Sequence, residues 1–290
     1  MSPRRGWLET WLLMLVVLAT GCRPQLSSYT PIVIGPVIEK LASGEGAVRL
    51  ERLSYSQHNQ RGQIWLGTID PSLSDISVES GEGKERALED IVPSSRRTRD
   101  HITINGGFYD DNGPLGLVVS HGHTIKRFRA DGGSGVLVLE GGMPEIVHRE
   151  AFRRTRVLDH ALQSIDRLVA DGQVLVARRQ DAPRDARSLV GITAQQQLVV
   201  AVVFDQDSVS QDAGGQVWLN RQSTSTGPTL RELAELAVRP RDAGGLGCRW
   251  ALNLDGGWSS AMRVKIGPDR RSITPYRGTY TALLASPRTP

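Results

Sequence analysis

Short apolar runs typical of β-strands follow one another along most of this chain of 290 residues. They are rich in β-branched residues, and Gly, Asp and Ser residues bound them, as is usual for strands joined by turns. The predicted strands are Gly62–Ile69, Ile76–Val78, His101–Asn105, Gly116–Ser120, Thr124–Phe128, Gly135–Leu139, Arg167–Ala170, Val174–Val176, Leu189–Thr193, Leu198–Phe204, Ala251–Leu254, Ala261–Val264 and Thr279–Leu284.

Two segments predict helices. Lys84–Ile91 has helix-forming composition, and Thr229–Glu232 is a capping box that opens an apolar run ended by Pro240. Strands and helices do not alternate regularly, which disfavours a doubly wound parallel sheet. The sequence therefore predicts an α+β fold of strand-rich mixed sheets with a few helices, in a single domain.

The amino terminus differs from the rest of the chain. Its apolar run, Trp11–Leu18, is shorter than the ~20 residues that span a bilayer, and small residues precede Cys22 as in a bacterial lipobox. We therefore predict a lipoprotein signal peptide over 1–21, lipidation of Cys22, a flexible tether over 22–46 rich in Pro, Ser and Gly, and a domain over 47–290. A plain cleaved signal peptide and a twin-arginine export signal are the alternatives.

Lipidation would anchor the protein in the bacterial cell envelope, facing the periplasm or the exterior, and at the outer membrane if the cell is Gram-negative. It would also leave Cys248 without a partner, because these are the chain's two cysteines. We expect no disulfide, and Cys248 is interpreted as a small buried hydrophobe. The formal net charge of +4 is too small to indicate a nucleic-acid partner.

Two strand ends share one pattern of polar residues and paired glycines. Trp250–Leu254 runs into Asp255, Gly256 and Gly257, and His101–Asn105 runs into a second glycine pair. Paired glycines let a backbone turn sharply with its N–H groups exposed, so that such a turn can receive an anion or a sugar. We expect the two strand ends to face one cleft.

These stretches belong to an ordered series of motifs that resembles the phosphodiester glycosidase family, which includes the lysosomal uncovering enzyme. The motifs are Asn105–Tyr109, Gly113–Leu117, Arg187–Gly191, Thr229–Ala234 and Asn253–Ser260. The resemblance runs from about Gly62 to Leu284 and makes 47–290 a phosphodiester glycosidase-like domain. One departure is Ile165–Asp166, where many members of the family carry Gly-Pro, which concerns substrate shape more than chemistry.

The resemblance implies hydrolysis of the glycosidic bond of sugar-1-phosphodiesters or related cell-envelope glycans. It implies three catalytic candidates: Asp255 as a carboxylate that stabilises an oxocarbenium-like centre or activates water, Arg187 as a phosphate ligand, and Asn105 as a ligand of sugar hydroxyls or phosphate. The substrate-binding candidates are Gly106, Gly107, Tyr109, Asp110, Gly256, Gly257, Trp258, Ser259 and Ser260. Asp110 or Asp111 is the candidate for a second carboxylate, and either is equally explained as a turn residue.

Several other functions are weighed against this one. The same cleft would suit a glycan-binding envelope lipoprotein without activity, whereas a phosphodiesterase cutting the P–O bond would require a metal. No cofactor is expected, because His121 and His123 lack a third ligand nearby in the sequence. The expected partners are a carbohydrate phosphodiester or surface glycan, and the membrane through the lipid on Cys22.

Overall fold

The computed structural model describes residues 30–153, 157–177 and 183–289. The chain divides into two units, 1–30 and 31–290, and the description concerns the second unit. The predicted signal peptide and Cys22 lie outside the described residues. Among the described helices, none is long and apolar enough to cross a membrane.

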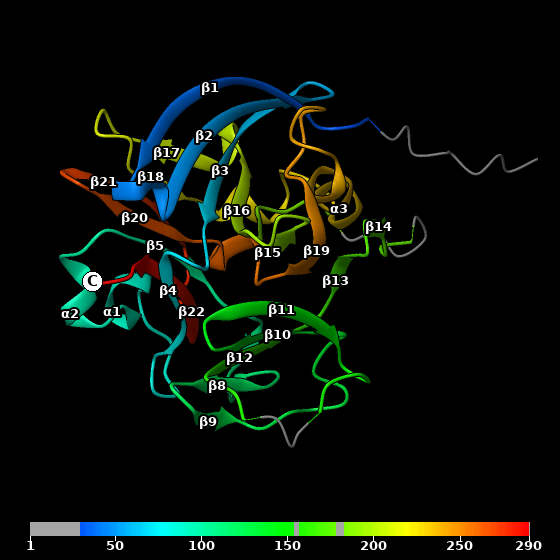
Figure 1. Cartoon of the computed structure of the whole chain (residues 1–290). Coiled ribbons are helices and arrows are strands. Elements are labelled where there is room, and N and C mark those ends of the chain that lie inside the picture. Colours follow the sequence, from blue (N-terminus) through cyan, green and yellow to red (C-terminus); the bar gives the residue numbers. More distant parts are fainter. Residues whose placement is uncertain (1–29, 154–156, 178–182, 290) are drawn as a thin grey trace, which may run out of the picture. The chain divides into compact units, whose positions relative to one another are not determined.

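Strands dominate the described chain and form three large sheets (Figure 1). The eight-stranded sheet has the order β1 (Val33–Ala42), β2 (Val48–Gln57), β3 (Gln60–Ile69), β16 (Leu198–Asp205), β15 (Arg187–Thr193), β19 (Cys248–Asn253), β13 (Arg167–Ala170) and β14 (Gln173–Val174). The seven-stranded sheet has the order β17 (Val209–Gln211), β18 (Val217–Leu219), β21 (Asp269–Thr274), β20 (Met262–Ile266), β5 (His101–Asn105), β22 (Thr281–Pro287) and β4 (Ser74–Ser80).

The five-stranded sheet has the order β11 (Met143–His148), β10 (Gly135–Glu140), β12 (His160–Ser164), β8 (Val118–Ser120) and β9 (His123–Lys126), and β6 (Tyr109–Asp110) pairs with β7 (Gly113–Pro114). The pairing of β18 with β21 is parallel, and the other pairings of the described strands are antiparallel. The α-helices are α1 (Leu88–Ile91), α2 (Ser94–Arg97) and α3 (Leu230–Val238), and the 3₁₀ turns are η1 (Gly44–Gly46), η3 (Gln206–Ser208), η4 (Arg221–Thr224) and η5 (Gly257–Ser259). This arrangement confirms the predicted α+β class.

The main hydrophobic core joins all three large sheets. Trp65 from β3, Ile104 from β5 and Leu137 from β10 are fully buried members of one cluster. Alternation explains this placement, because one face of each strand points to the cluster while the other carries polar residues or a second layer. A second cluster lies under α3, which packs on β13 and β19, and the buried Cys248 belongs to it as predicted.

The structure corrects the predicted tether. Val33–Ala42, which composition assigned to the tether over 22–46, forms the edge strand β1 and pairs with β2. Its register shifts around Pro36, since proline is accommodated in an edge strand at a bulge. Mostly exposed side chains and a proline hide such a strand from periodicity analysis.

The two predicted helices differ in outcome. The capping box at Thr229 is present and opens α3, and the Glu232 carboxylate accepts a hydrogen bond from the Thr229 backbone N–H. Lys84–Ile91 is helical only from Leu88, because Arg86 instead forms a β-bridge with Thr279. The helical preference of the local composition is overridden there by β-pairing with a segment far along the chain.

Candidate active site

The two glycine-paired strand ends meet, as their shared pattern predicts. Asn105 at the end of β5 donates a side-chain hydrogen bond of 2.7 Å to the backbone carbonyl of Asp255. The Asp255 N–H donates in return to the carbonyl of Gly106 at 3.1 Å. These bonds join the seven-stranded sheet to the end of β19 in the eight-stranded sheet and hold both turns in one site.

Asn105 is fully buried, and its side chain serves the protein itself. Its carbonyl oxygen accepts hydrogen bonds from the Ser188 hydroxyl at 2.8 Å and from the Ala261 N–H at 3.0 Å. Its amide is engaged with Asp255, so the side chain bridges three segments. We therefore assign Asn105 to positioning Asp255, in place of the substrate contact expected from the sequence.

The Asp255 carboxyl has a pKa far above that of an ordinary Asp. Burial is the main cause that raises its pKa to about 7, and the nearby carboxyl of Asp185 raises it further. Hydrogen bonds from the Ser259 hydroxyl and the Gly256 N–H, and the charge of Arg277, act in the opposite direction. At neutral pH this carboxyl therefore exchanges readily between its charged and neutral forms.

Asp185 is a second carboxyl at the same turn, and no motif or periodicity in the sequence marked it. Burial raises its pKa to about 6, although the positive charge of Arg187 lowers it. Its Oδ1 is buried, has no hydrogen-bond partner in the described structure, and lies 2.9 Å from where a Cβ on Gly257 would stand. A buried carboxylate oxygen without a partner is costly, which indicates a position completed by water or a ligand.

Arg187 opens β15 behind this pair and is buried. Its guanidinium donates to the carbonyl oxygens of Pro183 and Pro228, and one of its nitrogens lies 4.0 Å from the Asp185 carboxylate. The arginine thus ties two loops together and lies beside the Asp185 carboxylate. We assign it to fixing Asp185, since at least two of its donors are committed to the backbone.

The wall beside Asp255 is built around Tyr109. Its hydroxyl lies 3.1 Å from the Ser259 hydroxyl and donates to the carbonyl of Gly278 at 3.0 Å. Arg277, which the sequence reading missed, lies with its guanidinium 5.9 Å from the Tyr109 ring centre and lowers the pKa of Asp255. It is exposed and makes an ion pair of 3.3 Å with Glu85, so a partly compensated cation lies at the solvent-exposed edge of the site.

Trp258 extends the site to the surface. The residue is 36% exposed, and its ring packs against Tyr276 with 5.5 Å between ring centres. The indole N–H donates to the carbonyl of Arg221 at 3.2 Å, which fixes the orientation of the ring. Two adjoining exposed aromatic rings provide a surface on which a sugar can stack.

The glycine pairs are required by close packing. A Cβ on Gly106 would lie 2.1 Å from the Thr281 hydroxyl, and one on Gly107 would lie 2.9 Å from the carbonyl oxygen of Gln163. At Gly256 the neighbour is the Ala186 carbonyl oxygen at 2.9 Å, and Gly257 adopts φ +56, which favours glycine. The N–H of Gly257 is bonded to Ala186, so this donor holds the turn.

Two other predicted residues, Asp110 and Ser260, differ in exposure. Asp110 is exposed in the β6–β7 hairpin, where its carboxylate accepts a hydrogen bond from the Asn112 N–H at 2.8 Å. Ser260 is fully buried, and its hydroxyl has no partner in the described structure. The described residues hold no group of three or more His, Cys, Asp or Glu side chains arranged for a metal.

A strand-rich α+β domain with two carboxyl groups in one site has the make-up of a glycoside-cleaving hydrolase. A family model of phosphodiester glycosidases matches residues 98–282, which is more than half of the chain. The chain belongs to the phosphodiester glycosidase family.

Solved structures share its fold at low identity. The catalytic domain of zebrafish N-acetylglucosamine-1-phosphodiester alpha-N-acetylglucosaminidase, auto-inhibited by its pro-peptide, matches with a TM-score of 0.54 at 14% identity, over 90% of this chain and 83% of that one. A hypothetical protein from Synechocystis matches with a TM-score of 0.55 at 12% identity, over 90% of this chain and 68% of that one. No curated protein sequence matches the chain.

Proposed function

We propose that the protein hydrolyses the bond between a sugar and the phosphate of a sugar-1-phosphodiester, or of a related cell-envelope glycan. The observation that carries the proposal is the pair Asp185 and Asp255, two carboxyls of raised pKa at one glycine turn, with an unpartnered buried oxygen on Asp185. Family membership supports a glycosidase-type hydrolase, and this pair supplies the acid and base groups that such a reaction uses.

Hydrolysis of such a bond depends more on a charged carboxylate than on a strong general acid. Cleavage breaks the bond between the anomeric carbon and the phosphate oxygen, and the electron pair leaves with the phosphate. Because a phosphate monoester has a second pKa of about 6, it leaves with little protonation. Water adds to the anomeric carbon, and its proton passes to the ionised carboxylate, which also stabilises positive charge on the ring.

The raised pKa values suit a division of roles between the two carboxyls. Two nearby carboxyls resist being charged together, so near pH 7 one readily keeps its proton while the other is ionised. On this proposal the exposed Arg277 binds the phosphodiester at the solvent-exposed edge of the site. The rings of Trp258 and Tyr276 bind the sugar or a neighbouring unit of the glycan. A lipid on Cys22 would keep this site at the envelope.

The test is hydrolysis of a panel of sugar-1-phosphodiesters in water labelled with heavy oxygen, using a soluble fragment that begins near Ser27. We expect label in the sugar, and a ~10²- to 10⁴-fold lower kcat for both Asp255→Asn and Asp185→Asn. Asp242→Asn, which changes an exposed carboxylate in the loop after α3, is the matched control and should leave kcat unchanged.

The competing proposal is a glycan-binding protein without activity, which the exposed pair Trp258 and Tyr276 favours. In that case no member of the panel turns over, and Asp255→Asn binds glycan nearly as well as the unmodified protein. Label appearing in the phosphate would contradict the glycosidase proposal, because it would mean cleavage of the P–O bond.

A further inference from the structure

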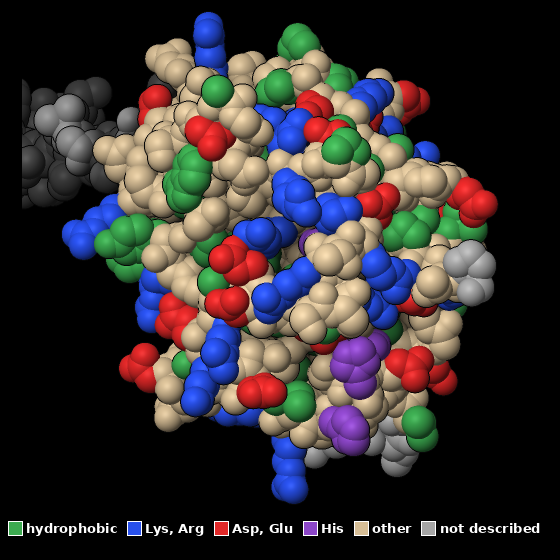
Figure 2. Space-filling view, turned by 90° about the vertical axis from the view of Figure 1, so that its left-hand side faces the viewer, with side chains coloured by type: hydrophobic (Ala, Val, Ile, Leu, Met, Phe, Trp, Pro, Cys, Tyr) green, Lys and Arg blue, Asp and Glu red, His purple; other side chains and the backbone are tan. Residues whose placement is uncertain are grey.

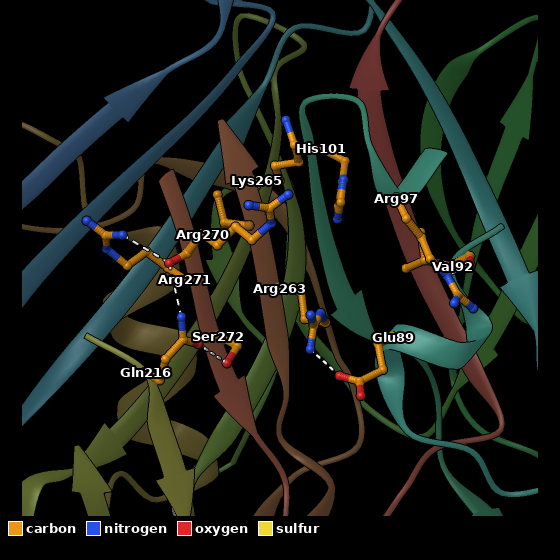
Figure 3. A pocket seen from close by; sticks show the side chains of 11 residues that line it. Glu89, Val92, Arg97, His101, Gln216, Arg263, Lys265, Arg270, Arg271 and Ser272 are labelled. Carbon is orange, nitrogen blue, oxygen red and sulfur yellow. Dashed lines mark hydrogen bonds and ion pairs between the residues drawn. The ribbon is translucent and has the colours of Figure 1, made fainter. Parts of the chain in front are cut away.

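A basic pocket of about 290 Å³ lies on β20 and β21, at the end of β5 opposite Asn105 (Figure 3). His101, Lys265 and Arg270 form one row across three neighbouring strands, because Lys265 pairs with both of the others. Arg263 lies two residues before Lys265 on β20. Arg97 from α2 lines the pocket on the side of β5 away from β20. Lys and Arg side chains also gather near the middle of the face turned toward the viewer in Figure 2.

The row places like charges directly opposite each other. Lys265 and Arg270 are cross-strand partners, an arrangement that destabilises a sheet. The same positive charges act on His101. Burial is the main cause that lowers its pKa, and the charges of Arg263 and Lys265 lower it further. A repulsive cross-strand pair of this kind is expected where a bound ligand supplies the compensating negative charge.

Carboxylates in and beside the pocket compensate only part of its charge, and Arg271 is already paired with Glu39. Glu89 pairs with Arg263, and Asp100 lies 3.5 Å from Lys265. Arg97 instead donates to the carbonyl oxygens of Val92 at 2.9 Å and Asp90 at 3.4 Å, so two of its nitrogens are committed to the backbone while its charge has no carboxylate partner in the described structure. Within the described residues, Arg270 has no carboxylate at ion-pair distance.

We propose that this pocket binds a phosphate group, carried either by a soluble phosphate compound or by a lipid headgroup. The pocket holds several cations, and the Arg270 guanidinium has no carboxylate at ion-pair distance among the described residues. Arg263 engages Glu89 through Nη1, and the N–H donors of such guanidinium groups match the geometry of phosphate oxygens. The pocket's volume is near the lower limit of small-molecule sites and fits one phosphate group. The site is separate from the carboxyl pair, so it stands independently of the proposed hydrolysis.

The first experiment is calorimetric titration of the folded protein with inorganic pyrophosphate at low salt. The variant Lys265→Gln with Arg270→Gln should bind at least tenfold more weakly. The matched control, Arg61→Gln with Lys84→Gln, removes the same charge from two exposed positions outside the pocket and should bind as the unmodified protein does. The pocket variant should also keep nearly the same Tm, because it relieves the repulsion between Lys265 and Arg270 while it loses the ion pair between Lys265 and Asp100.

The second experiment identifies the source of the phosphate by sedimentation with vesicles of phosphatidylglycerol or phosphatidylcholine. Pyrophosphate binding without vesicle binding supports a soluble ligand. Binding to phosphatidylglycerol vesicles that only the pocket variant loses supports a lipid headgroup. The proposal is overturned if neither probe binds, or if both double variants weaken binding equally, since the effect would then follow net charge and not the pocket.

Discussion

At the scale of single residues, the raised pKa of Asp255 has a consequence for stability. Because the folded protein holds this proton up to a pH of about 7, while an unfolded Asp releases it near 3.8, the folded state binds more protons between these values. The contribution is therefore fully present below pH 3.8 and is lost as the pH rises through about 7. Asp185 adds to the same slope up to about pH 6.

Asp255→Asn should remove part of this pH dependence. The variant's free energy of unfolding should rise relative to that of the unmodified protein by about 3 kcal/mol between pH 5 and pH 8, since the excess proton is held over about two pH units and each unit corresponds to about 1.4 kcal/mol. Urea denaturation at a series of pH values measures it, with the exposed Asp111→Asn as control. Parallel curves for Asp255→Asn and the unmodified protein would show that Asp255 titrates normally.

At the scale of elements, the short helix α3 depends on its capping box. The Thr229 hydroxyl accepts from the Glu232 N–H at 3.3 Å, and the Glu232 carboxylate accepts from the Thr229 N–H at 2.9 Å while pairing with Arg184 at 3.0 Å. Glu232 therefore has a structural role, as the sequence suggested.

Thr229→Ala should lower the free energy of unfolding by about 1 kcal/mol, because it leaves a backbone donor at the helix start without its cap. Thr229→Ser keeps the hydroxyl and should recover most of the loss. The midpoint of urea unfolding reports both variants. An alanine variant as stable as the serine variant would show that packing of α3 on β13 and β19 alone sustains the helix.

The elements also show where sequence reasoning succeeds and where it ends. The two turns could be paired in advance, because each follows a buried strand and carries Asn or Asp before two glycines. Asp185 and Arg277 could not be found, since both lie in loops without a period, and their place beside Asp255 depends on how distant strands are ordered. The strand order places β5 between β20 and β22, pairings that no local pattern encodes.

At the scale of the whole molecule, the start of the folded domain and the two cysteines bear on how the protein would be attached to a membrane. The described body begins at the edge strand β1, so the structured domain starts earlier than composition indicated. Cys248, the second cysteine, is buried under α3, where burial raises the pKa of its thiol to about 12. A thiol of that kind stays neutral and unreactive near neutral pH. The lipid anchor that we propose would therefore be carried by Cys22, which lies outside the described residues.

We therefore expect Cys22→Ser to move the protein from the membrane fraction to the soluble fraction of a bacterial host. Cys248→Ser is the matched control and should stay with the membrane, because it changes the only other cysteine without touching the anchor. Cell fractionation with immunoblotting measures both, and detergent should release the unmodified protein. If Cys22→Ser still sediments with membranes, a lipid on Cys22 is not the anchor, and a plain cleaved signal peptide with binding by the folded domain becomes the better account. Loss of membrane association in the Lys265→Gln, Arg270→Gln variant would then identify the basic pocket as the contact.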